Sequence, residues 1–234
     1  MRRALLNVSL ATLALVAGLG HFHARAGTVT LEALQFSADL VRANADGEPQ
    51  DNTGKLYVAG DNIRIETPDF PGDYFLIDLG AGTSYLVQPA KRMIMDSRRS
   101  SPLALVFVPV DPDNPCPQWQ ARWTSQDGAA AGEGTREAPW SCERLGEETI
   151  GGRRAIKFRV EPQQRHLHFA WVDPELRMPI RMQAAFGTAE LANLRIGPPP
   201  AGLFKVPYQF RKFDPLHLIE QIKQSDVWVE QPPP

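Results

Sequence analysis

The chain has 234 residues, of which 43% are hydrophobic, and it carries 25 basic and 27 acidic residues for a net charge of −2. This length and composition predict one domain with a real hydrophobic core, and they exclude a globally disordered chain. The slight acidic excess argues against a nucleic-acid partner and against electrostatic docking on anionic lipid, since both select for clustered Lys and Arg.

The N-terminus has the three parts of a secretory signal peptide. Arg2 and Arg3 precede an uncharged run over residues 4–20, and Ala24-Arg25-Ala26 follows as a cleavage signature. We expect cleavage after Ala26, which removes residues 1–26 and releases the rest into the periplasm without stable membrane insertion. An uncleaved anchor is the alternative, but the apolar run is short and interrupted for a spanning helix, which needs ~20 apolar residues.

The remainder carries 22 basic and 27 acidic residues, a net charge of −5, and the only two cysteines, Cys116 and Cys142. In an exported protein such a pair predicts a disulfide. Closing this loop is worth roughly 3–4 kcal/mol in the chain-entropy model. A redox or metal site is the alternative, but the spacing is not that of a C-x-x-C motif. We therefore predict a disulfide-bounded loop over residues 116–142.

Alternating apolar and polar residues predict a first β block. Residues 55–59 and 62–66 read as a tight hairpin around Gly60-Asp61, because glycine can take the positive φ of a two-residue turn. Leu56, Val58, Ile63 and Ile65 should share one face. Residues 74–78 and 84–88 form a second hairpin, and residues 92–96 continue the meander.

A second β block follows the cysteine-bounded loop. Its expected strands cover residues 155–160, 166–171, 177–183 and 190–196. Pro179 suggests an edge or a bulge in the third of these, because proline cannot donate to a ladder. Residues 28–44 are ambiguous, with strand favoured from Phe36.

Helices are few in this reading. The best candidate starts near Asp214, which can act as an N-cap before Pro215, and residues 214–234 are expected to hold this helix and a Pro-rich tail.

Catalytic signatures are absent: there is no G-x-S-x-G, P-loop, H-E-x-x-H or G-x-G-x-x-G motif. We therefore expect a non-catalytic protein without a cofactor or metal. His166 and His168 would face one side of a strand, and with Asp173 or His217 they could ligate a metal. The alternative is two surface histidines opposite Leu167, Phe169 and Trp171.

Acidic neighbours such as Glu147 and Glu148 would point to opposite faces of a strand. They are therefore expected to be solvated surface groups and not an acid–base pair.

A curved sheet can hold a lipophilic ligand on one face. The candidates for lining such a groove are Leu56, Tyr57, Val58, Ile63, Ile65, Phe75, Ile77, Tyr85, Val87, Met93 and Met95. Met93 and Met95 would adapt to irregular acyl chains. Packing in a dry core is the alternative for every one of these residues.

Five segments resemble, in order, motifs of the lipoprotein-localisation superfamily of exported proteins, which is LolA/LolB-like. They are the hairpin at 55–66, the hairpin at 76–89, the strand at 152–160, the Trp-x-Asp…Pro segment at 170–181, and Leu-Phe-Lys-Val-Pro at 203–207. The cysteine-bounded insertion and the C-terminal extension depart from the carriers of that superfamily.

The resemblance implies a mainly β (α+β) fold over residues 27–213: an incomplete, curved antiparallel β-barrel, or half-barrel, with a few short helices. It also implies a concave side that holds an acyl chain, a lipoprotein or another lipophilic group.

Two functions follow. The first is a periplasmic binding or carrier-like protein with a hydrophobic groove. The second is an envelope structural or stress-signalling protein whose barrel is filled by its own side chains and which binds a protein partner. In that second case an edge strand or the loop tryptophans Trp119, Trp123 and Trp140 would be the anchors. Packing over the disulfide is the alternative role for these tryptophans. A filled barrel would favour the second.

Overall fold

The computed structural model describes residues 34–51, 53–97, 106–127, 140–161, 167–185 and 187–214, except for the side chains of residues 122–127. The predicted signal peptide and the predicted C-terminal helix lie outside these residues.

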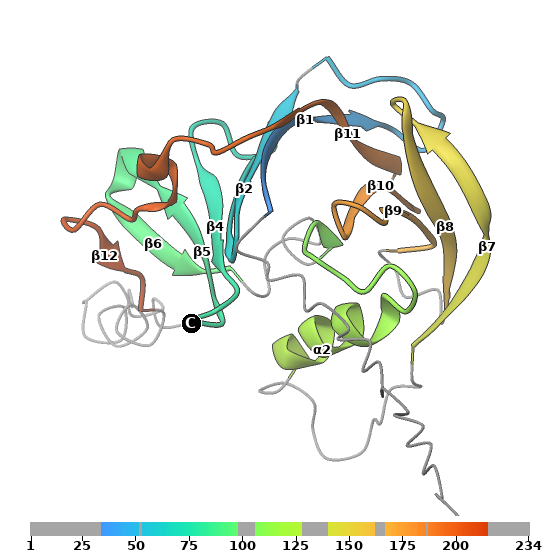
Figure 1. Ribbon diagram of the computed structural model, residues 1–234. Coiled ribbons are helices and arrows are strands. Elements are labelled where there is room, and N and C mark those ends of the chain that lie inside the picture. Colours follow the sequence, from blue (N-terminus) through green and yellow to red (C-terminus); the bar gives the residue numbers. More distant parts are fainter. Residues whose placement is uncertain are drawn as a thin grey trace, which may run out of the picture.

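The described strands form one open, strongly curved sheet of 12 strands, in the order β12-β6-β5-β4-β3-β2-β1-β11-β10-β9-β8-β7 (Figure 1). Their bounds are β1 (Gln35–Ala43), β2 (Gly54–Ala59), β3 (Asn62–Glu66), β4 (Tyr74–Asp78), β5 (Thr83–Gln88), β6 (Met93–Asp96), β7 (Ser141–Ile150), β8 (Arg153–Glu161), β9 (Phe169–Asp173), β10 (Met178–Ala184), β11 (Gly187–Ile196) and β12 (Arg211–Lys212). All neighbours pair antiparallel except β12 with β6. The predicted fold class, a mainly β half-barrel with few helices, is confirmed.

Local sequence explains the first hairpin. Buried and half-buried residues alternate along β2 and β3, and Leu56 pairs with Ile65 while Val58 pairs with Ile63. Gly60 in the turn has φ of 58°, which glycine adopts without steric cost. The predicted hairpin and its shared apolar face are both confirmed.

β1 joins the two β blocks into one sheet. It pairs with β2 along one edge and with β11 along the other. Phe36 and Leu40 of β1 are fully buried in a core cluster that also takes residues from β2 to β5 and from β8 to β11. One hydrophobic core therefore runs along the inner side of both halves.

The inner, concave side of the sheet is covered by residues 106–121, which we call the cover (Figure 1). The cover consists of a segment without regular strands and the first part of helix α2 (Cys116–Asp127). Val106, Phe107, Val108 and Trp119 are completely buried in the same cluster as the concave strand residues. The cover therefore supplies the second layer of the core.

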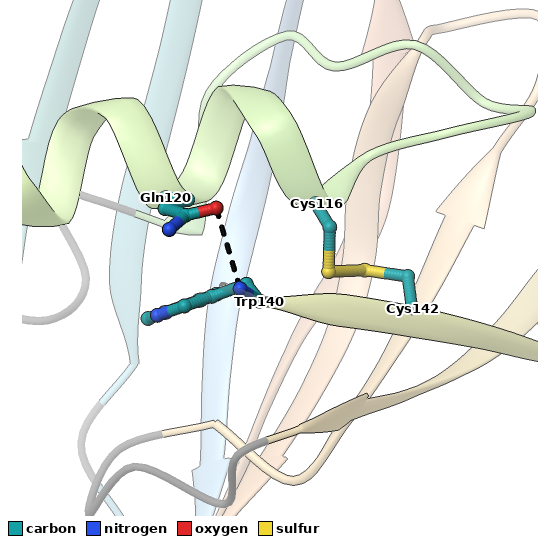
Figure 2. Close-up of a disulfide and its surroundings, with 4 residues drawn as sticks. All are labelled: Cys116, Gln120, Trp140 and Cys142. Atoms are coloured by element: carbon teal, nitrogen blue, oxygen red, sulfur yellow. Dashed lines mark hydrogen bonds between the residues drawn. A yellow bond between two sulfur atoms is a disulfide. The ribbon is translucent and has the colours of Figure 1, made fainter. Parts of the chain in front are cut away.

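Three ties hold the cover. The Val110 amide donates to the Arg177 carbonyl at 2.8 Å, in the turn between β9 and β10. Trp119 Nε1 donates to the Val106 carbonyl at 3.3 Å, within the cover itself. The predicted disulfide is present: Cys116 at the start of α2 is bonded to Cys142 in β7 (Figure 2).

The outer, convex side carries a second layer over β3 to β6, made by residues 200–213, which we call the strap. It holds a 3-10 turn, η3 (Ala201–Phe204), and the short β12. Phe204, Val206 and Phe210 pack on a smaller cluster that contains Tyr74, Leu76 and Val87. The Phe213 amide donates to the Ile94 carbonyl at 2.7 Å, so the strap also extends the edge of the sheet beyond β6.

The second β block differs in places from the expectation. β7 and α2 were not predicted, and β9 begins only at Phe169, after a bend at His168. Leu167 and Trp171 both belong to the main core cluster, and Phe169 packs against it. Trp171 Nε1 also donates to Glu148, and the Lys157 ammonium lies over the Trp171 ring. Pro179 sits at a bulge in β10, which has neighbours on both sides; the bulge is confirmed and the edge is not.

Candidate functional site

The groove candidates divide between the two faces of the sheet. Those in the concave cluster are Leu56, Val58, Ile63, Ile65, Phe75, Ile77 and, half-buried against it, Met95. Met93 lies two residues before Met95 on β6 and therefore on the same side of that strand. These residues form a continuous apolar surface from β2 to β6.

Tyr57, Tyr85 and Val87 do not belong to that surface, which corrects the prediction of one common groove. Val87 is buried in the convex cluster and Tyr85 packs against it. Tyr57 pairs with Arg64 on β3, between the concave pairs Leu56–Ile65 and Val58–Ile63. Because neighbours along a strand point to opposite faces, these three side chains face outward.

The concave surface is closed by the protein's own cover. Leu56, Val58, Ile63, Ile65 and Phe75 each have 0% exposed area. Their partners across the core include Phe107 and Trp119. A lipophilic ligand on this face would have to take the place of cover side chains.

The loop tryptophans are buried rather than presented to a partner. Trp119 is 0% and Trp140 7% exposed. The Trp140 amide donates to Gln120 Oε1 at 3.3 Å, and its ring lies beneath α2 beside the disulfide (Figure 2). For Trp119 and Trp140 the burial supports the alternative of packing near the disulfide over that of anchoring a partner, and the Trp123 side chain lies outside the described part.

A histidine metal site finds no support among the residues that the structure describes, none of which form a group of ligands able to hold a metal ion. His168 is half-buried at the bend before β9, and His166 and His217 lie outside the described ranges. Both carboxylate oxygens of Asp173 already accept hydrogen bonds. Arg153 Nε donates to one oxygen, and the backbone amides of Glu175 and Leu176 donate to the other at 2.9 and 3.0 Å. Hydrogen bonding to Asp173 raises the pKa of Arg153.

Glu147 and Glu148 have separate partners, as their adjacent positions predicted. Glu147 accepts a hydrogen bond from Arg144 at 2.7 Å. Glu148 accepts one from Lys157 at 2.9 Å and another from Trp171 Nε1 at 2.7 Å. The Lys157 hydrogen bond, followed by that of Trp171, lowers the pKa of Glu148. Both glutamates thus belong to ionic networks of the sheet.

A polar cleft of about 740 Å³, which the sequence did not predict, lies at the ends of β2, β3 and β4. Its lining residues are Asp51, Thr53, Gly54, Lys55, Arg64, Glu66, Thr67, Pro68, Phe70, Pro71, Gly72, Asp73 and Tyr74. The Arg64 guanidinium lies 3.4 Å from the centre of the Tyr74 ring and donates to the Leu203 carbonyl of the strap at 3.1 Å. Alternation on β3 places Arg64 outward, but nothing in the sequence shows that the strap and the turn before Tyr74 enclose it.

Among the described residues, no helix has the length and apolar character needed to cross a membrane.

Neither a family profile nor a curated protein matches the sequence. Solved structures are similar at low identity. A chain of the MucA/MucB complex from Pseudomonas aeruginosa has 14% identity and a TM-score of 0.40 over 78% of this chain and 60% of its own. This chain spans 57% to 60% of the MucB chains that it matches.

Two further structures show the range of these likenesses. A putative outer membrane lipoprotein-sorting protein domain from Vibrio parahaemolyticus has 14% identity and a TM-score of 0.31, over 73% of this chain and 89% of its own. PNGF-II has 9% identity and a TM-score of 0.46, over 82% of this chain and 34% of its own. These structures are similar to this chain in backbone arrangement alone.

Proposed function

We propose that this protein is a non-catalytic binding protein of the cell envelope that takes a lipophilic group, such as an acyl chain, between the concave face of its sheet and the cover. The predicted signal peptide and the disulfide support the placement in an oxidising compartment such as the periplasm. A free acyl chain and the acyl chains of a lipoprotein share this chemistry.

The construction of the cover is the observation that carries the proposal. The concave face is apolar across both halves of the sheet. The described segment before α2 adds no strand to that sheet, and the Val110 amide bond to Arg177 is its backbone tie to it. Side chains such as Phe107 close the face, and side-chain contacts can be exchanged for those of a ligand without breaking a β-ladder.

The energetics permit this exchange. Moving an acyl chain out of water gains ~0.8 kcal/mol for each buried methylene, so a long chain can offset the contacts that the cover gives up. The disulfide would keep α2 attached at Cys116 while the segment around Phe107 moves. Only molecules with an open cover can bind the acyl chain. The apparent affinity is therefore the affinity of the open state multiplied by the small fraction of molecules that are open.

Native mass spectrometry of protein purified from the periplasm, followed by lipid extraction, tests the proposal. We expect a co-purifying acyl species, and uptake of added fatty acid by the delipidated protein. Phe107→Ala shortens a side chain of the cover and leaves every strand residue unchanged. Truncation of a buried Phe costs about 3–5 kcal/mol of packing, here between the cover and the sheet. The cover then opens more easily, so the apparent affinity for fatty acid should rise by about tenfold or more.

Tyr85→Ala is the matched control, because Tyr85 is a half-buried aromatic residue on the convex face. It should leave lipid uptake unchanged. A clean apo mass, with no fatty-acid uptake by either the wild type or Phe107→Ala, would refute the lipid-binding function.

That result would favour the second function, a protein-binding role with a permanently filled sheet. Its support is the complete burial of Leu56, Ile63 and Ile65 beneath the cover. Crosslinking in the periplasm would then identify the partner.

A further inference from the structure

We propose that the polar cleft on the convex side binds a neutral, hydroxyl-rich ligand of the carbohydrate class. The cleft lies at the ends of β2, β3 and β4, where Phe70 in its lining also packs against the concave core, and no residue of the cover lines it. Its volume of about 740 Å³ is within the range of small-molecule sites.

Tyr74 gives the cleft a hydroxyl group that a ligand can reach. The Tyr74 side chain lines the cleft, its hydroxyl is accessible to solvent, and this hydroxyl hydrogen-bonds to none of the residues that the structure describes. It is therefore available to donate a hydrogen bond to a ligand in the cleft and to accept one from it. The Arg64 guanidinium against the Tyr74 ring holds the ring in place.

Two carboxylates offer further acceptors from fixed positions. Arg64 Nε and Nη2 both approach Oε1 of Glu66, at 2.8 and 2.7 Å, which leaves Oε2 without a donor from the described residues. Asp73 is held in the same way, because its Oδ2 accepts from Gln88 Nε2 at 2.7 Å. Sugar hydroxyls can donate to the remaining oxygens and can both donate to and accept from a tyrosine hydroxyl.

The charges of the lining select for a neutral ligand. Lys55 and Arg64 would repel a cation, while Asp51, Glu66 and Asp73 would repel an anion. A ligand that carries many hydroxyls and no net charge can accept hydrogen bonds from the cationic side chains and donate them to the carboxylates. It is repelled by neither kind of charge.

The apolar part of the lining suits the carbon face of a sugar ring. Phe70, Pro68 and Pro71 line the cleft beside the polar groups. Phe70 is fixed edge-on against the buried Phe75, with ring centres 5.7 Å apart. A rigid apolar wall next to convergent polar groups is the common form of a small-molecule site.

Calorimetric or NMR titration of the wild type with cellobiose, maltose and chitobiose tests the inference. We expect saturable binding of at least one of them. Tyr74→Phe removes only the hydroxyl and should weaken that binding by about threefold to tenfold, the worth of one hydrogen bond. Tyr57→Phe makes the same change on the same face but outside the cleft, and should leave the affinity unchanged.

Absence of saturable binding to all three sugars would overturn the inference, and so would binding that Tyr74→Phe leaves intact. Stronger binding of spermidine or citrate, as charged probes, would overturn the neutral ligand class. Phe107→Ala should not change sugar affinity, so failure here and failure of the lipid-binding function give separate results.

Discussion

A single buried carboxylate organises the turn between β9 and β10. Asp173 is 1% exposed and accepts hydrogen bonds from Arg153 and from two backbone amides of the turn. Glu175 also pairs with Arg153, but its side chain is 84% exposed. Asp173→Ala should therefore lower the free energy of unfolding by about 2–4 kcal/mol, because it strands the two amides and a partly buried cation. Glu175→Ala should change it by no more than about 1 kcal/mol. Urea denaturation measures both, and equal losses would contradict this assignment.

At the scale of elements, the disulfide ties α2 to edge strand β7 across a sequence separation of 26 residues. Replacing both cysteines, as Cys116→Ser with Cys142→Ser, should cost about 3–4 kcal/mol of unfolding free energy, since the unfolded chain regains the freedom of the open loop. The cover should also loosen, which thermal unfolding combined with a hydrophobic dye would detect as lower stability and greater dye binding before the transition. The reduced wild type is the control and should behave like the double variant; unchanged stability in both would show that the bond does not restrain the cover.

At the scale of the whole molecule, β1 joins the two halves into one sheet with one inner core. We expect a single cooperative unfolding transition, because neither half can expose its side of the core without disrupting the other. Tryptophan fluorescence reports on all five tryptophans, which include Trp119 in the cover and Trp171 in β9, while far-UV circular dichroism follows the entire sheet. The two signals should give coincident urea curves; two separated transitions would show that the halves unfold independently.

Strand positions could be predicted well because the signal is local. The alternation at 55–59 and 62–66 and the glycine between them were enough for β2 and β3. β7 was missed because it is an edge strand whose middle residues are all exposed, so no apolar alternation marks it. α2 was missed because its small apolar share carries little helical periodicity, and tertiary contacts through Trp119 and Cys116 hold it.

The candidate sites were predicted less well. The Cys116–Cys142 bond followed from the presence of two cysteines in a chain with a predicted export signal, whereas the groove list mixed Tyr57, Tyr85 and Val87 with residues of the opposite face. The polar cleft could not be predicted, because Arg64 and Tyr74 meet the Leu203 carbonyl from a segment far along the chain.

The sequence by itself determined the hairpin of β2 and β3 with its shared apolar face, most other strand positions, and that the two cysteines are joined. Only the tertiary structure decided which face is concave and what covers it. Alternation along a strand is relative: it separates Ile65 from Arg64 but leaves open which of them faces inward. That choice is made by the cover and the strap, segments distant in sequence that pack on opposite sides of the same sheet.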